Sequence, residues 1–445
     1  MECAAIMQLS KYLKIFLIII EDHLNNFMSE KNKFSIHEDW TVVIMGALII
    51  LLSISGLILP VAVFNWSQTS ELFQNIFALN NLGVILLQFI FVLVIAVLAA
   101  LLTGKPVKNF LLGFPLVYLI TMLALILAGN SQIKALNLEA VIFSLSLGLI
   151  IGNFFKLPEW LKESLSTELF VKIGLVLLGT NIIFADILKA GSLGLIQALA
   201  VVLSVWYFAF WLCKKLKIDS ELTMMISSAV SICGVSAAIA TSGAIKGDPK
   251  KLSYVISMVL ITAIPMMIFM PIIAKYFGFS QEVTGAWLGG SIDTTGAVVA
   301  SGSLVGETAL KISTIVKFSQ NVLLGLAAFA ISVYWTYTNH DLSADPDSKP
   351  TLKVIWERFP KFVLGFVGAS LVFSFMLNPE TTNLVKGSLR NLQGLWFALA
   401  FTSIGLETNF ADLFNKQSKK PFYAFLIAQT FNVFVTLIIA MLLFG

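Results

Sequence analysis

Two apolar segments of the chain are interrupted at their centres by small and hydroxylated residues. The first interruption reads Ser231-Ile232-Cys233-Gly234-Val235-Ser236, and the second reads Gly289-Gly290-Ser291-Ile292-Asp293-Thr294-Thr295-Gly296. In a bilayer, non-helical backbone persists only where protein or a water-filled cavity satisfies its polar groups. Secondary transporters often build their substrate site from paired broken helices near the midplane. The two interruptions are therefore the first candidates for chemistry.

Asp293 is the one carboxylate in these interruptions. It lies about 11 residues into its apolar segment, ~16 Å along the helix axis at 1.5 Å per residue. An ionisable group at that depth costs several kcal/mol unless it is paired or hydrated, so it indicates an ion-coupling or substrate role ahead of a structural ion pair. Lys172 and Lys317 also lie inside apolar segments and are its candidate partners.

Lys317 belongs to a polar stripe, because Ser313, Lys317 and Asn321 are spaced four apart and share one helix face. Such a stripe faces protein or water and not lipid. The ammonium could attract an anion or neutralise Asp293, and the sequence leaves both open. The first interruption adds backbone N–H groups and hydroxyls without a charged side chain, a combination that favours anions at a helix N-terminus.

The predicted site combines the two interruptions with the lysine stripe. Its predicted substrate-binding residues are Ser231, Cys233, Gly234, Ser236, Ser291, Thr294, Thr295, Lys317 and Asn321, and Asp293 is the predicted ion-coupling carboxylate. Cys233 is expected to be a small packing residue and not a nucleophile. Gly285, Gly289 and Gly290 have a structural alternative, in which they seat a neighbouring helix.

The composition places these residues in a membrane protein. Of 445 residues, 58% are hydrophobic and only 12% are charged, with a mean hydropathy of +0.90. A soluble chain of this size could not bury so much apolar surface, which predicts an all-α polytopic membrane protein. The small net charge of +4 gives no nucleic-acid footprint. Three cysteines without CxxC spacing and three histidines argue against a zinc or iron–sulfur cofactor.

Thirteen apolar segments are predicted to cross the bilayer, and about 11–13 is the expected range. They lie near 41–63, 82–102, 108–128, 138–155, 170–188, 193–213, 222–246, 251–275, 282–303, 309–335, 360–377, 391–407 and 420–443. Alternating the loops puts nineteen Lys and Arg on the N-terminal side and eight on the other, which predicts a cytoplasmic N-terminus and an external C-terminus. Residues 1–40 form a cytoplasmic segment, with translation expected from Met28 and 1–27 untranslated. Residues 41–445 form the transporter domain, with a cytoplasmic loop at 336–360.

An internal repeat relates residues 178–188 to residues 404–414, sharing a glycine and Phe-Ala-Asp at an offset of 226. The counted spans make the two copies antiparallel, as inverted repeats require. The same count makes the two interrupted segments parallel, because one span separates them. Either one of them is re-entrant or the partners pair differently.

The sequence resembles the YeiH-type family of bacterial inner-membrane proteins, often labelled sulfate exporters. The resembling stretches are SEKNKFSIHEDW before the first span, LGLIIGN at 147–153, KIGLVLLG at 172–179, SICGVSAA at 231–238, GGSIDTTGAVVASG at 289–302, IVK at 315–317 and IGLETNFADL at 404–413. The resemblance implies an inverted-repeat transporter with crossed broken helices, related to cation/proton antiporters and bile-acid-type sodium symporters. Asn321 stands where the family favours arginine, which weakens the case for direct anion binding at that position.

Three functions compete. The favoured one is a secondary transporter, an exporter of a small inorganic or sulfonated anion, with a proton or sodium ion as the coupling ion and no other cofactor. An ion exchanger of the cation/proton type is the alternative. An intramembrane hydrolase using Ser236 needs a base within the bilayer, but the histidines lie in loops or the N-terminal segment, so no enzyme is expected. A homodimer remains open.

Overall fold

The computed structural model describes residues 36–105, 107–135, 140–182, 184–338, 356, 359–408 and 419–445. The expected start at Met28, most of the 336–360 loop and the second Phe-Ala-Asp, Phe410 to Asp412, lie outside these ranges. The described residues are helical, with one isolated bridge between Trp66 and Asn130 and no strand. The predicted all-α class is confirmed.

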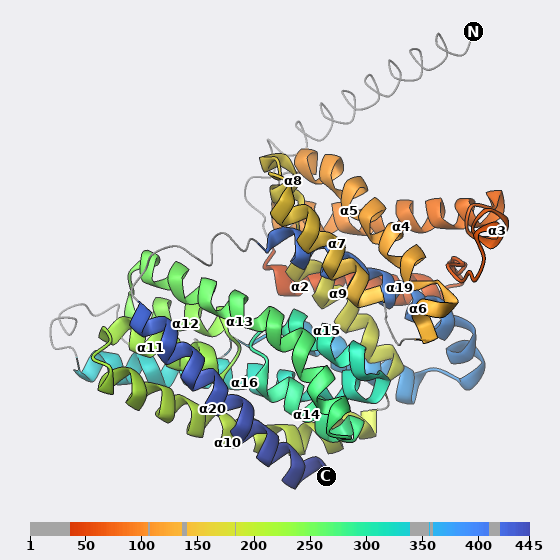
Figure 1. The fold of residues 1–445 in the computed structure, drawn as a ribbon. Helices are drawn as coiled ribbons and strands as arrows, with labels where there is room; N and C mark the ends of the chain where they lie inside the picture. The colour runs from red at the N-terminus through yellow and green to blue at the C-terminus, as the bar shows by residue number, and fades with distance from the viewer. Residues whose placement is uncertain are drawn as a thin grey trace.

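The helices form two bundles (Figure 1). The first, called the α5 bundle, contains α2 (Glu38–Ile54), α3 (Thr69–Glu71), η1 (Leu72–Ile76), α4 (Leu79–Thr103), α5 (Val107–Ala128), α6 (Ser131–Ala135), α7 (Ala140–Phe154), α8 (Glu159–Ser164), α9 (Thr167–Leu178), η2 (Gly179–Asn181), α18 (Phe362–Leu371), η5 (Val372–Met376) and α19 (Pro379–Glu407). The second, called the hairpin bundle, contains α10 (Phe184–Lys215), α11 (Ser220–Ser231), α12 (Val235–Ile245), α13 (Pro249–Tyr276), α14 (Gln281–Ser291), α15 (Thr295–Val305), α16 (Glu307–Thr338) and α20 (Lys419–Phe444).

Within the described residues, six helices are long and apolar enough to cross a membrane, namely α4 and α5, most of α10, α13 and α16, and α20. Their apolar surfaces face lipid or other helices, and the cores are filled by large side chains. In the α5 bundle, Phe170 packs against Phe114 and Trp396 at ring-centroid distances of 6.0 and 5.7 Å. In the hairpin bundle, Phe208 stacks on Phe431 at 3.9 Å.

The α11–α12 pair is a re-entrant hairpin. Its two ends meet at one side of the bundle, where Lys251 Nζ lies 2.8 Å from Asp219 Oδ1 and the backbone N–H of Asp248 donates to Glu221 Oε2 at 2.9 Å. Asp219 and Glu221 begin α11, whereas Asp248 and Lys251 follow α12. The chain therefore enters and leaves at the same face, and the prediction that 222–246 crosses was wrong.

The α14–α15 pair is a second re-entrant hairpin. Gln281 opens α14, and its Oε1 accepts a hydrogen bond at 3.4 Å from the backbone N–H of Ala309, which follows α15. Of the two alternatives left open for 282–303, a full crossing or a re-entrant segment, the structure shows the re-entrant one. Between the hairpins, α13 has 28 residues and is roughly 42 Å long at 1.5 Å per residue. It joins the base of one hairpin to the base of the other, so the hairpins enter from opposite ends (Figure 1).

Counted as full crossings, the two interrupted segments would be parallel. As hairpins that enter from opposite ends of the bundle, they are inverted, as the repeat architecture requires. Each returns the chain to the side from which it came, so the later loops keep their predicted sides. Two of the thirteen predicted crossings are thereby replaced by hairpins. Lys246, Lys250 and Lys251 move to the predicted cytoplasmic side and Lys275 moves to the other, changing the charge split to twenty-one against six. The charge difference behind the predicted orientation is thus larger with the two hairpins than without them.

The described ends of the aligned segments lie on the antiparallel helices α9 and α19, while Phe184 to Asp186 belong to α10. Asn181, just after α9, donates to Gln393 of α19 at 2.9 Å, and Gly174, earlier in α9, lies against Phe397, later in α19. The two helices therefore run in opposite directions.

Candidate functional site

The tips of the two hairpins touch each other inside the hairpin bundle. The first tip, Ile232 to Gly234, turns at Gly234, which has φ +61° and ψ −112°. Positive φ of this kind favours glycine because it has no Cβ. A Cβ built on Gly234 would lie 2.9 Å from the Cβ of Asp293 in the second tip and 2.7 Å from Val259 Cγ1. Glycine is thus required both for the turn and for the approach of the second hairpin.

The second tip, Ile292 to Thr294, is extended and carries the only charge of the two tips. Thr294 caps α15, because its hydroxyl accepts the backbone N–H of Ala297 at 3.4 Å. Asp293 is 2% exposed, and its Oδ2 is buried without a hydrogen-bond partner. A buried carboxylate oxygen in that state is costly, so Asp293 can bind a ligand or a proton through it.

Lys317 of α16 binds the C-terminal end of the first helix of each hairpin, α11 in one and α14 in the other. Its ammonium, 1% exposed, donates to the carbonyls of Ile232 at 3.0 Å and Ile292 at 2.8 Å, and to Gln320 Oε1 at 3.0 Å. A cation at a helix C-terminus is favoured by the helix dipole. These three acceptors use all three ammonium hydrogens. Among the described residues no ion pair within 4.0 Å joins Lys317 to Asp293, and the ammonium instead binds the carbonyl of Ile292, directly before Asp293. The charge partnership of the two residues therefore stays a prediction.

Amide side chains satisfy the remaining carbonyls at these helix ends. Gln320 donates to the carbonyl of Gly290 at 3.0 Å. From α20, Gln429 donates to the carbonyl of Ser291 at 2.8 Å, and Asn432 to that of Val230 at 3.0 Å. The last carbonyls of a helix have no intrahelical partner, and here side chains of α16 and α20 supply one for each of these. Sequence reasoning missed α20, although Gln429, Asn432 and Thr436 are spaced three and four apart on an apolar helix.

The structure brings the predicted site residues together at the two tips and the facing side of α16. Ser231, Cys233 and Ser291 are buried, Ser236 is exposed, and Thr294 and Thr295 are half-buried. Asn321 donates to Thr295 Oγ1 at 3.4 Å, which links α16 to the start of α15. The hydroxyl of Ser231 donates to the carbonyl of Ser227 within α11, so it satisfies its own helix.

The structure also distinguishes between the alternative roles of the glycines in α14 and of Lys172. Gly285 and Gly289 let α14 pack on α16, because a Cβ on either would lie within 3 Å of a carbonyl oxygen, that of Ala309 or Ser313. The packing role of these glycines is therefore confirmed. Lys172 lies elsewhere, in the α5 bundle, where its Nζ pairs with Asp39 at 3.0 Å and Glu38 at 3.3 Å. It is no partner of Asp293.

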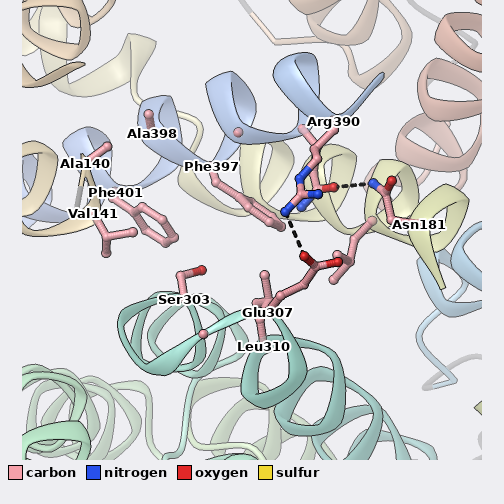
Figure 2. Close-up of a pocket in the computed structure, with 14 residues that line it drawn as sticks. Ala140, Val141, Asn181, Ser303, Glu307, Leu310, Arg390, Phe397, Ala398 and Phe401 are labelled. Atoms are coloured by element: carbon pink, nitrogen blue, oxygen red, sulfur yellow. Dashed lines mark hydrogen bonds and ion pairs between the residues drawn. The ribbon is translucent and has the colours of Figure 1, made fainter. Parts of the chain in front are cut away.

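A cavity of about 280 Å³ lies between the bundles, at the base of the second hairpin and away from the tips. Figure 2 shows Arg390 of α19 pointing at Glu307 of α16, and their ion pair, 2.7 Å long, joins the two bundles across the cavity. Asn181 and Gln393 form a second polar pair on its α5-bundle side. This cavity could not be predicted from the sequence, because its walls come from helices far apart in the chain.

The family described as Conserved hypothetical protein 698 matches residues 112–424 of this chain. A UPF0324 membrane protein of Rhodopirellula baltica is 42% identical over 351 residues, covering 77% of this chain and 64% of the relative. One from Nitratidesulfovibrio vulgaris is 38% identical over 357 residues, covering 77% and 60%. Another, from Nitrosomonas europaea, is 28% identical over 450 residues, covering 84% and 89%.

The chain spans about three fifths of the length of the first two relatives. No solved structure matches it. These matches support the family that the sequence resemblance indicated, and the relatives' names identify membrane proteins.

Proposed function

Since this chain belongs to the conserved hypothetical protein 698 family, whose relatives are membrane proteins, we propose that it is a secondary active transporter. It exports a small anion such as sulfate or a sulfonate, driven by a proton or sodium gradient through alternating access. The observation that carries this proposal is the meeting of two hairpin tips that enter from opposite ends of one bundle. Irregular backbone at such depth needs a cavity or a ligand to satisfy it.

The second helix of each hairpin, α12 in one and α15 in the other, supplies the anion-binding groups. The first N–H groups of a helix lack intrahelical acceptors, and the helix dipole makes that end positive. At the tips, α12 begins at Val235 without a side-chain cap, and α15 begins at Thr295. The hydroxyls of Ser236, Thr294 and Thr295 lie beside these ends, and the ammonium of Lys317 adds a positive charge. Backbone N–H groups, hydroxyls and a nearby ammonium are groups that recognise an oxyanion.

The two bundles provide the moving parts. They meet chiefly through α15, which packs against α7, α9 and α19, and through α10 against α18. Because both hairpins belong to one bundle, a shift of that bundle against the α5 bundle carries the whole site. Alternating access in inverted-repeat transporters is this kind of rigid-body movement around a fixed site.

Transport by the purified full-length chain in proteoliposomes tests the proposal. Uptake of labelled sulfate and of a sulfonate is measured under imposed pH and sodium gradients, with protein-free liposomes as the control. We expect gradient-dependent anion flux that the change Asp293→Asn abolishes while the protein still inserts. Absence of flux for every anion under both gradients contradicts an anion transporter.

An exchanger of cations for protons is the alternative, and the unpartnered oxygen of Asp293 is the observation that favours it. The same liposomes decide between the two, because an exchanger acidifies or alkalinises the lumen when sodium is added without any anion substrate. A hydrolase is not proposed, since the one described histidine, His37, caps α2 and lies away from Ser236.

A further inference from the structure

Three oxygen atoms beside the second tip are buried without a hydrogen-bond partner. They are Ser291 Oγ, Asp293 Oδ2 and Gln429 Oε1, from residues that are 1%, 2% and 4% exposed. They belong to one small region, because the Gln429 amide nitrogen donates to the backbone carbonyl of Ser291 at 2.8 Å, and Asp293 follows two residues later in the same tip. Gln429 is fixed by this bond with its amide nitrogen toward the backbone, which leaves the carbonyl oxygen free.

Three buried oxygens without a hydrogen-bond partner are energetically unfavourable. Each buried polar atom without a partner costs about 1–3 kcal/mol. A proton on Asp293 would satisfy one of the three oxygens and leave the hydroxyl of Ser291 and the carbonyl of Gln429 as they are. A hard cation would be coordinated by all three, since such ions take carboxylate, carbonyl and hydroxyl oxygens as ligands.

We propose that Ser291, Asp293 and Gln429 form a sodium site at the second hairpin tip, and that its occupation raises the affinity for the anion. This rests on the proposed function, of which sodium would be the coupling ion. The site carries one carboxylate, and a monovalent cation matches that charge. Unwound backbone beside half-helix C-termini is a setting in which transporters coordinate sodium.

Charge balance links the cation to the anion. With the site empty, the charges of Asp293 and Lys317 cancel across the two tips. A bound sodium ion leaves one net positive charge beside the N-terminal ends of α12 and α15, where an anion restores neutrality. Linkage then requires the anion to raise sodium affinity by the same factor, in either direction of transport.

Thermal unfolding of the purified full chain in detergent tests the site without requiring transport. The midpoint is measured against NaCl concentration at constant ionic strength, with choline chloride and KCl as replacements. We expect a sodium-specific rise in the midpoint. Ser291→Ala removes a hydroxyl that makes no hydrogen bond, so it should leave the midpoint in choline unchanged and weaken sodium binding at least tenfold. Asp293→Asn should abolish the sodium response.

Ser144→Ala is the matched control, because Ser144 of α7 also has a buried hydroxyl without a partner but lies in the α5 bundle. It should respond to sodium as the unmodified chain does. Equal midpoints in sodium and choline for the unmodified chain overturn the sodium site, and so does a full response in Asp293→Asn. A site-dependent sodium response without anion flux keeps this inference and refutes the proposed transport. Proton-driven anion flux without any sodium response supports the proposed transport and overturns the sodium site.

Discussion

The two hairpins have arms of nearly equal length and the same supports, but their tips differ. In both, side chains of α16 and α20 hold the carbonyls where the first arm ends. The first tip turns on an uncapped glycine and carries no charge, whereas the second carries Asp293 and the Thr294 cap. One tip therefore offers only donors to a ligand, while the other adds an acceptor that can bind a cation. The two tips therefore share their supports from α16 and α20 but differ in the ligand groups that they offer.

The inverted arrangement of the two hairpins requires their bases to face opposite sides of the membrane, and this can be tested directly. Lys250 and Glu282 are exposed and lie at the two bases. In a cysteine-free background, Lys250→Cys should react with an impermeant thiol reagent only after the cells are opened, whereas Glu282→Cys should react in intact cells. Labelling of both from the same side would contradict the inverted pair of hairpins.

Removing the shared support should have the largest effect on stability. Lys317→Gln takes the ammonium from two tip carbonyls and leaves Asp293 as an uncompensated buried charge, so we expect a loss of about 3–5 kcal/mol. Adding Asp293→Asn should recover part of that loss, because neutrality returns while the carbonyls stay weakly held. Thermal unfolding of both variants measures this, and a single variant as stable as the unmodified chain would show that Lys317 supports neither tip.

The glycine turn is the next most sensitive feature and belongs to the first tip alone. Gly234→Ala places a Cβ at positive φ and against Asp293, for an expected loss of about 1–3 kcal/mol. Gly368→Ala in α18 is the control, since nothing lies within 4 Å of its added Cβ, and it should be neutral or slightly stabilising. Equal unfolding midpoints for the two variants would mean that the tips are not in contact.

The cap belongs to the second tip alone. Thr294→Ala removes the acceptor for the Ala297 N–H and should cost about 0.5–1 kcal/mol, with Thr294→Ser retaining most of the stability. Denaturant or thermal unfolding compares the two. If Thr294→Ser loses as much as Thr294→Ala, the methyl group and not the hydroxyl matters at this position.

The smallest effect is expected at the base of the first hairpin. Partial burial opposes ionisation of Asp219, but hydrogen bonds from Lys251 and from the backbone N–H of Leu222 outweigh it and lower the pKa of the carboxyl group below its ordinary 3.8. A lowered pKa stabilises the folded state above pH 3.8, and that contribution is lost as the pH falls through the folded value. Because the pair is partly exposed, Asp219→Asn should cost only about 0.2–0.5 kcal/mol at pH 6, and progressively less as the pH falls below 3.8.

Much of the site could be predicted from the sequence, because its signals are local. Asp293 and the glycines and hydroxyls around it stand out at apolar depth, and Lys317 shares a helix face with Asn321. The hairpins could not be predicted, since two arms of 11 residues joined by a three-residue tip have the length and hydropathy of a single crossing. Gln429 was missed because its partner Ser291 is more than 130 residues away in the chain.

The length of the hairpin arms sets the electrical position of the site. Arms of 11–12 residues place the tips ~16–18 Å from their bases, near the middle of a hydrocarbon core about 30 Å thick. An ion that reaches Asp293 from either side then crosses about half of the membrane potential, worth roughly 1.2 kcal/mol per charge at 100 mV. That changes the apparent affinity for a monovalent ion by about sevenfold. Affinities measured in vesicles without a membrane potential will therefore differ from those in a polarised cell.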